Sequence, residues 1–331
     1  MISTELIEIT KRDRMLMTRK TSLPSPLHIK TPLIESLTMG QRVEPKIWLK
    51  LESVQPCGSF KARGIGHACQ HHVAQGATHL LASSAGNAGL AVAYCGRQLG
   101  VPVTVVVPVT TKPCAIKLIE QEGANVLIKG NEWDGAHRHA QTLLKPGWAY
   151  IHPFDDPLLW RGHATLIDEI AADGIQPDGI VVSVGGGGLM CGLVEGIRRQ
   201  GWPDIPLLAV ETIGADSLYT AQQKQRPTAL DKITSIATSL GARQVANRSF
   251  ELLSEYPIET HRVSDQQAVA ACYQFLADHR ILVEPACGAA LATVNEQSDF
   301  FAGKKNVVIV VCGGVGVTID QLHSWQQQLS S

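Results

Sequence analysis

A lysine at the expected start of a helix is the residue of this chain best suited to covalent chemistry. Lys61 follows a turn rich in Pro, Gly and Ser, and it lies in a stretch, 59–75, whose apolar residues recur at helical spacing. The positive end of a helix dipole disfavours a protonated amine, and desolvation lowers the pKa of that amine further. A neutral lysine can form a Schiff base with a carbonyl compound. The alternative is an ordinary solvated lysine. The other motifs of the chain must distinguish between these two interpretations of Lys61.

A second motif consists of four successive glycines, Gly185, Gly186, Gly187 and Gly188, between an apolar run and a helical pattern. Unpaired N–H groups at a helix start favour the binding of an anion. The alternative is a flexible turn, but four glycines lose much backbone entropy on folding, which a turn without a ligand does not explain. The loop lacks the G-K-[ST] of a nucleotide P-loop, and Met190 interrupts the G-x-G-x-x-G spacing of dinucleotide-binding loops. We therefore expect it to bind a phosphate group.

A third motif follows the apolar run 79–82 and consists of Ser84, Ala85, Gly86, Asn87 and Ala88. Its serine and glycine precede a helix of small residues, which suits a second anion cradle, although a capped helix explains them equally well. Cys312 ends the apolar run 307–311 and precedes two glycines. Ligands bind at the carboxyl ends of strands in open α/β sheets, so this thiol either faces a site or is a core cysteine.

The elements that position these motifs follow from short apolar runs, which are mostly β-branched and typical of parallel strands buried on both faces. The runs lie at 47–51, 79–82, 103–108, 125–128, 179–184, 207–210 and 307–311. Helical patterns fall near 59–75, 87–99, 114–122, 132–145, 157–172, 189–200, 265–280 and 315–328. This alternation predicts a three-layer α/β fold. No linker is visible, so the two lobes that 331 residues allow are expected to be interleaved.

Composition excludes several classes of protein. Lys+Arg 29 against Asp+Glu 30 gives net charge −1, which suggests neither a nucleic-acid nor a membrane-surface partner. The eight cysteines contain no C-x-x-C pair, and several fall inside apolar runs, as reduced thiols of a cytoplasmic protein do. No run is long enough to span a membrane, and no secretory leader begins the chain, so we expect a soluble cytoplasmic protein.

Taken together, the motifs around Lys61, Asn87 and the four glycines resemble the fold-type-II pyridoxal-phosphate enzymes, in the serine/threonine dehydratase branch. Further matches are Pro153-Phe154-Asp155-Asp156-Pro157, the run from Val283-Glu284-Pro285 to Ala292, and Val310-Val311-Cys312-Gly313-Gly314. The resemblance covers about residue 26 to the C-terminus. It implies an α/β, two-lobed, three-layer fold of the tryptophan synthase β-subunit type. The implied parts are an N-terminal extension (1–24), a large cofactor-binding domain (25–61 and 159–331) and a small substrate-carboxylate domain (62–158).

The resemblance also implies roles for the site residues. Lys61 would carry pyridoxal 5'-phosphate as a Schiff base, with Phe60 stacked on the ring. Gly185, Gly186, Gly187 and Gly188 would hold the phosphate, Asn87 the ring hydroxyl, and Ser84 to Ala88 the substrate carboxylate. Cys312 would face the ring nitrogen. Because a thiol is a weak donor, that nitrogen would stay largely unprotonated, which favours prompt β-elimination.

The implied activity is that of an L-serine and L-threonine ammonia-lyase. A racemase of the same fold needs a second acid, and the family's racemases place a serine where this chain has Ala85, whose methyl group delivers no proton. A β-replacement synthase usually has a Thr-Ser-Gly-Asn loop, which is absent. A non-enzymatic nucleotide-binding protein would bind no coloured cofactor. One methyl group is worth only about 1–3 kcal/mol in a pocket, so serine and threonine are not ranked.

Two further expectations come from the resemblance. Glu211, Ala215 and Ser217 match a segment in which a carboxylate, a backbone carbonyl and a hydroxyl bind a monovalent cation such as K+. Oxygen ligands suit a hard cation, although a surface turn is the alternative. Ser239 departs from the small residue expected on the ring face opposite Phe60. The family is usually homodimeric.

Overall fold

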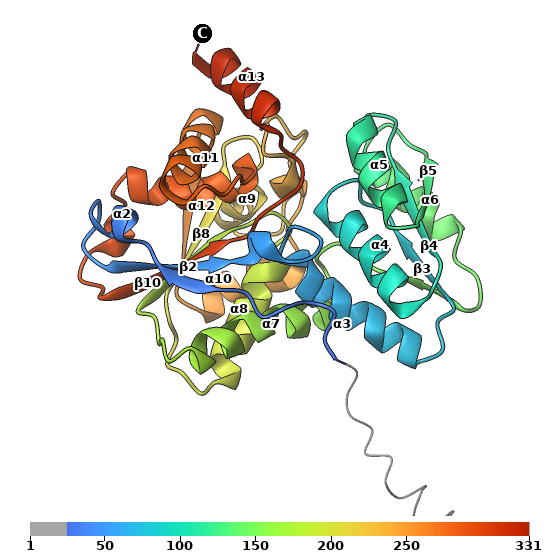
Figure 1. The fold of residues 1–331 in the computed structure, drawn as a ribbon, viewed down its shortest axis with the longest axis horizontal. Helices are drawn as coiled ribbons and strands as arrows, with labels where there is room; N and C mark the ends of the chain where they lie inside the picture. Colours follow the sequence, from blue (N-terminus) through green and yellow to red (C-terminus); the bar gives the residue numbers. More distant parts are fainter. Residues whose placement is uncertain (1–24, 331) are drawn as a thin grey trace, which may run out of the picture.

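Two β-sheets organise the protein, whose computed structural model describes residues 25–330 (Figure 1). One sheet has six strands and the other has four. The four-stranded sheet and its helices come from the middle of the chain, and the six-stranded sheet is built from residues on both sides of it. The lobes are therefore interleaved. The predicted N-terminal extension, 1–24, lies outside the described residues.

The six-stranded sheet forms the larger core. In spatial order its strands are β1 (Leu33–Glu35), β2 (Lys46–Leu51), β10 (Asn306–Val311), β7 (Gly179–Ser183), β8 (Leu207–Thr212) and β9 (Ile258–Val263). Neighbouring strands are parallel except β1, which is antiparallel to β2. Every residue of β7 and β8 is buried. The apolar residues 180–182 of β7 and 207–210 of β8 reflect that burial on both faces.

Helices cover both faces of this sheet. They are α2 (Leu37–Gly40), α7 (Pro157–Ala172), α8 (Gly188–Arg199), α9 (Ser217–Lys224), α10 (Asn247–Glu255), α11 (Asp265–His279), α12 (Pro285–Asn295) and α13 (Ile319–Ser330). Figure 1 shows α11 and α12 on one face and α7 and α8 on the other. The arrangement is the predicted three-layer α/β architecture.

The four-stranded sheet is entirely parallel. In spatial order its strands are β5 (Asn125–Ile128), β4 (Val103–Val107), β3 (His79–Ala82) and β6 (Trp148–Tyr150). Leu80 and Val105 pack with α4 (Asn87–Leu99) and α5 (Pro113–Gln121), whereas Leu81 and Val106 pack with α6 (Trp133–Thr142). Because side chains alternate along a strand, α6 covers the face opposite to α4 and α5.

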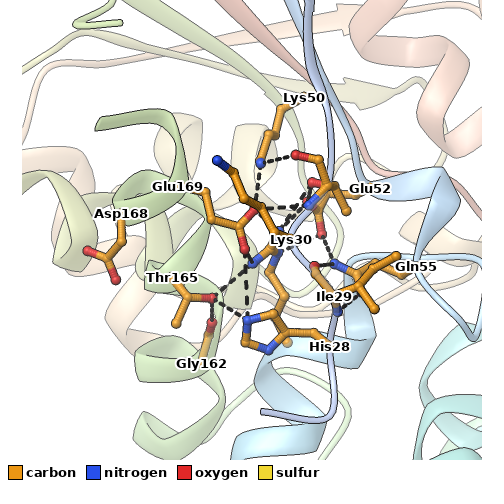
Figure 2. Close-up of polar contacts among 12 residues, drawn as sticks. His28, Ile29, Lys30, Lys50, Glu52, Gln55, Gly162, Thr165, Asp168 and Glu169 are labelled. Atoms are coloured by element: carbon orange, nitrogen blue, oxygen red, sulfur yellow. Dashed lines mark hydrogen bonds and ion pairs between the residues drawn. The ribbon is translucent and has the colours of Figure 1, made fainter. Parts of the chain in front are cut away.

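Helix α3 (Lys61–Ala74) lies between the sheets, and a buried charge network fixes its first turn (Figure 2). The Arg63 side chain is fully buried and donates to both carboxylate oxygens of Glu52, at 2.7 and 2.8 Å. It also donates to both carboxylate oxygens of Glu169 on α7, each at 2.7 Å. Lys50 on β2 donates to Glu169 at 2.6 Å. Because removing one partner of a buried ion pair costs about 3–5 kcal/mol, this network holds the start of α3 firmly against β2 and α7.

The predicted strands are all present, but the prediction was incomplete. It missed β1 and β6, which are too short to show a period, and β9, whose Glu259, His261 and Arg262 interrupt any apolar run. It also missed α2, α9, α10 and α12. The prediction that the strands are buried on both faces was wrong for β5, where Ile128 is 51% exposed. This strand lies at a sheet edge. The domain boundaries remain predictions.

All eight cysteines are free, and all are buried except Cys114, which agrees with the expectation that several are core thiols. Within residues 25–330, no helix combines the length and the apolarity that crossing a membrane requires.

Candidate active site

Lys61 is the first residue of α3, as predicted, and its amine is enclosed by protein. Lys61 Nζ donates to the carbonyl oxygen of Pro153 at 2.5 Å and lies 5.0 Å from the centre of the Phe60 ring. The side chain as a whole keeps some exposure, but desolvation of the amine lowers the pKa of Lys61 to about 8. The predicted lowering is confirmed, and the structure identifies burial as its main cause. About a tenth of this amine is therefore neutral at pH 7, far more than for a lysine with the usual pKa.

The four glycines link β7 to α8, and none of them has room for a side chain. A Cβ atom would lie 3.0 Å from the Leu240 backbone at Gly185, and 2.2 Å from the Phe154 ring at Gly186. At Gly188 it would lie 2.5 Å from the Phe154 carbonyl oxygen. Gly187 is the N-cap of α8 and has φ +86°, which a residue with a side chain rarely adopts. The loop therefore brings bare backbone to the start of a helix, which suits a phosphate group.

The segment from Ser84 to Ala88 joins β3 to α4, and Asn87 is the first residue of that helix. A Cβ atom at Gly89 would lie 1.8 Å from the carbonyl oxygen of Ser84, so the loop folds tightly onto the helix start. Asn87 Nδ2 donates to Glu284 Oε1 at 2.8 Å and to Ser239 Oγ at 3.4 Å. These bonds join the second predicted anion cradle to the start of α12 and to the short turn that contains Ser239.

Cys312 follows β10 directly and is 6% exposed. A hydrogen bond with Cys287, together with burial, raises the pKa of the Cys312 thiol well above its usual value. The thiol is therefore neutral, which agrees with the weak donor expected there. The Cys312 carbonyl oxygen accepts from Phe60 N at 3.2 Å, and Gly58 O accepts from Gly314 N at 2.9 Å. The end of β10 and the turn before Lys61 are thus bonded to each other.

Sequence reasoning assigned no role to three residues that the structure places at this site. Pro153 accepts from Lys61, Phe154 packs on the glycine loop, and Glu284 accepts from Asn87. All three lie in motifs that carry the family resemblance, which was the only signal for them in the sequence. His163 also lies here, with its ring 5.0 Å from that of Phe60 and both nitrogens buried without a hydrogen-bond partner.

The residues predicted to bind a cation form a separate cluster at the end of β8. Glu211 is fully buried and accepts from the backbone N–H groups of Leu218 and Tyr219, each at 2.8 Å. Burial raises the pKa of Glu211 to about 8. Ser217 Oγ is buried and has no hydrogen-bond partner. Within residues 25–330, no group of three or more His, Cys, Asp or Glu side chains could hold a metal ion.

Comparison with known proteins places this site in a family. The family described as "Pyridoxal-phosphate dependent enzyme" matches residues 24–313. Human L-serine dehydratase/L-threonine deaminase is 45% identical over 315 residues, which cover 92% of this chain and 96% of that protein. L-serine dehydratase of Dictyostelium discoideum is 42% identical over 330 residues, which cover 93% of this chain and 94% of that protein.

A solved structure agrees with these matches. The L-serine ammonia-lyase of the fungus Rhizomucor miehei superposes with a TM-score of 0.86 at 33% identity, covering 91% of this chain and 99% of its own. The chain therefore belongs to the family of pyridoxal-phosphate-dependent enzymes and has their type II fold.

Proposed function

We propose that this protein is an ammonia-lyase that converts L-serine to pyruvate and ammonia, and L-threonine to 2-oxobutanoate and ammonia. The names of its relatives support both substrates, since the human protein is called L-serine dehydratase/L-threonine deaminase. The observation that carries the proposal is the enclosed amine of Lys61, with a pKa of about 8, at the first turn of α3. An amine that is partly neutral at neutral pH can act as a nucleophile and as a general base.

The residues present fit pyridoxal phosphate. The loop from Gly185 to Gly188, in which no Cβ atom fits, offers backbone N–H groups to the phosphate. Lys61, whose amine lies beside the Phe60 ring, would carry the cofactor covalently. Asn87 would offer an amide N–H to the ring oxygen, and the neutral Cys312 thiol would lie toward the ring nitrogen.

The chain's own groups then perform the binding and proton-transfer steps. Backbone N–H groups of the segment from Ser84 to Ala88 bind the substrate carboxylate at the start of α4. The bound cofactor supplies a sink for the electrons released when the Cα–H bond breaks. The substrate amine would first displace Lys61, and the freed neutral Nζ, positioned by the Pro153 carbonyl oxygen, would accept that proton. Loss of the β-hydroxyl group as water would complete the elimination. The small domain (62–158) closes over the substrate and excludes water.

Ala85 favours elimination over racemisation. A racemase must return a proton to the opposite face of Cα, and a methyl group has no proton to deliver. The same fold does occur in a racemase, since maize serine racemase superposes with a TM-score of 0.83 at 23% identity, covering 92% of this chain and 94% of its own. A β-replacement synthase is the other alternative, and it would need a pocket for a second nucleophile.

Steady-state kinetics on L-serine, L-threonine and their D-forms test the proposal. Pyruvate or 2-oxobutanoate is measured together with the enantiomeric composition of the remaining amino acid. We expect oxo-acid from both L-substrates and no racemisation. Racemised serine without pyruvate would establish the alternative function instead. A purified protein without the colour of a bound cofactor would contradict any pyridoxal-phosphate activity.

A monovalent cation such as K+ is proposed at Glu211, Ala215 and Ser217. The support is the buried Ser217 hydroxyl, which lacks a partner, close in sequence to a fully buried carboxylate. A buried polar group without a hydrogen bond costs about 1–3 kcal/mol, and an ion bound there would remove that cost. We also propose that the protein is a homodimer in the cytoplasm, for which the free cysteines and the family resemblance are the support.

A further inference from the structure

Glu284 is a buried carboxylate whose orientation is unusual. It is 5% exposed and is the N-cap residue of α12, yet its side chain accepts no hydrogen bond from that helix. A carboxylate at this position ordinarily accepts from the N–H groups of its own helix. The side chain points instead to the start of α4 and to the loop that follows Cys312.

The surrounding backbone is shaped to admit this carboxylate. Glu284 Oε1 accepts from Asn87 Nδ2 at 2.8 Å, and Oε2 accepts from Gly316 N at 3.2 Å. A Cβ atom at Gly314 would lie 1.9 Å from Glu284 Cδ, and one at Gly316 would lie 2.9 Å from Glu284 Oε2. Burial also raises the pKa of Glu284. Burying a carboxylate costs free energy, so the contacts that Glu284 makes here must offset that cost or serve a function.

The reason lies in the amide of Asn87. Asn87 Oδ1 accepts from Val315 N at 3.0 Å, while Nδ2 donates to Glu284. A backbone donor on one side and a carboxylate on the other determine which end of the amide is oxygen and which is nitrogen. Rotation of the Asn87 amide by half a turn would place its N–H donors against Val315 N, also a donor, and its carbonyl oxygen against the Glu284 carboxylate, also an acceptor. The second Nδ2 proton makes only a long contact, 3.4 Å, to Ser239 Oγ, and it is the one free to reach a ligand oxygen.

We propose that Glu284 is a positioning residue for the cofactor, which acts through Asn87. It holds the Asn87 amide so that an N–H group, rather than the carbonyl oxygen, faces the oxygen of the pyridine ring. It also joins the helix start that follows the substrate-carboxylate loop to the larger sheet. The inference rests on the proposed function, because it takes from that function the position of the ring beside Asn87.

The test is the binding of pyridoxal phosphate to apoprotein, followed by absorbance. Glu284→Leu removes both acceptors, and we expect the dissociation constant to rise about tenfold, with a shifted absorbance band of the bound cofactor. Glu284→Gln has an acceptor at one end only, so it should give a smaller rise. Glu296→Gln is the matched control. Glu296 is the C-cap residue of the same helix and accepts from His261 at 2.9 Å, so its replacement should leave affinity and absorbance unchanged.

A double-mutant cycle separates positioning from a purely structural role. If Glu284 acts through Asn87, Glu284→Leu should have no further effect on the dissociation constant in an Asn87→Ala protein. Equal effects with and without Asn87, or normal affinity and absorbance in both Glu284 variants, would overturn the inference. Thermal unfolding of the apoproteins monitors folding, and Glu284→Gln carries the test if Glu284→Leu does not fold. A wild-type protein that binds no pyridoxal phosphate would overturn the proposed function and this inference with it.

Discussion

The amine of Lys61 donates to the carbonyl oxygen of Pro153 at 2.5 Å, which joins the first turn of α3 to the segment before α7. The next residue, Phe154, lies against the glycine loop, because a Cβ atom at Gly186 would come within 2.2 Å of its ring. One short segment therefore contacts both the proposed nucleophile and the loop proposed to bind the phosphate.

Replacing Lys61 with Ala should abolish both the absorbance of lysine-bound cofactor and turnover, the latter by more than about a thousandfold, because the nucleophile and the general base are the same amine. Absorbance spectra and pyruvate assays check this. Lys30→Ala is the control, since Lys30 is an exposed lysine paired with Asp173. A Lys61→Ala protein that makes pyruvate at the normal rate would falsify the assignment of Lys61.

The lowered pKa of Lys61 predicts how the apoprotein reacts with its cofactor. Desolvation lowers this pKa from 10.5 to about 8, so the nucleophilic neutral amine accumulates as the pH rises toward 8 and levels off above it. The rate of covalent attachment should therefore rise with pH to a midpoint near 8. A model amine such as an acetylated lysine, with a midpoint near 10.4, is the comparison. The same midpoint for the protein and the model amine would contradict the prediction.

The pKa of Lys61 also affects the stability of the apoprotein. Between pH 8 and 10.5 the unfolded chain binds more protons at this lysine than the folded protein does. The contribution of Lys61 therefore makes the free energy of unfolding rise with pH across that window. Chemical denaturation of wild type and Lys61→Met at several pH values isolates this contribution. A difference between the two proteins that is independent of pH would show that Lys61 is not desolvated.

The glycine loop should not tolerate even one methyl group. Gly186→Ala forces a Cβ atom into the Phe154 ring, and we expect the affinity for pyridoxal phosphate to fall by about tenfold or more. Gly40→Ala is the control, because a Cβ atom there would lie 3.8 Å from its nearest neighbour, the Pro45 carbonyl oxygen. Titration of the apoproteins measures both. Unchanged affinity in Gly186→Ala would mean that the phosphate binds elsewhere.

Ala85 should decide between elimination and racemisation. Ala85→Ser places a hydroxyl group in the substrate-carboxylate loop, where it can deliver a proton, so D-serine should appear from L-serine while pyruvate formation falls. Ala85→Gly is the matched control, since it alters the same position without adding a hydroxyl group. Chromatography on a chiral phase measures the product. If the serine variant forms no D-serine, another feature prevents racemisation.

The proposed cation site predicts dependence on the salt present. Replacing potassium with a bulky organic cation should lower activity, because such an ion is too large for ligands at Glu211 and Ser217. Ser217→Ala should weaken the response to potassium by removing one ligand oxygen. Sodium chloride at matched ionic strength controls for screening. Activity that does not depend on the cation would contradict the proposal. Glu211 would then have only a structural role, since it accepts from two backbone N–H groups at the start of α9.

The sequence by itself determined the features that neighbouring residues encode. Lys61 and Asn87 begin helices, and the four glycines join a strand to a helix, as their local patterns predicted. The buried strands were readable because each is a short apolar run. The resemblance carried by these motifs then predicted the family, which the comparisons confirmed.

Only the tertiary structure decided which distant groups meet. Lys61 and Pro153 are 92 positions apart, and Asn87 and Glu284 are 197 apart, so no local pattern could join them. The exposure of β5 results from its position at a sheet edge. The order of strands in a sheet cannot be predicted from the sequence of a single strand. Burial is likewise a property of the packed molecule. For that reason the dominant cause of the lowered Lys61 pKa, and the turning of Glu284 toward Asn87, could be read only from the fold.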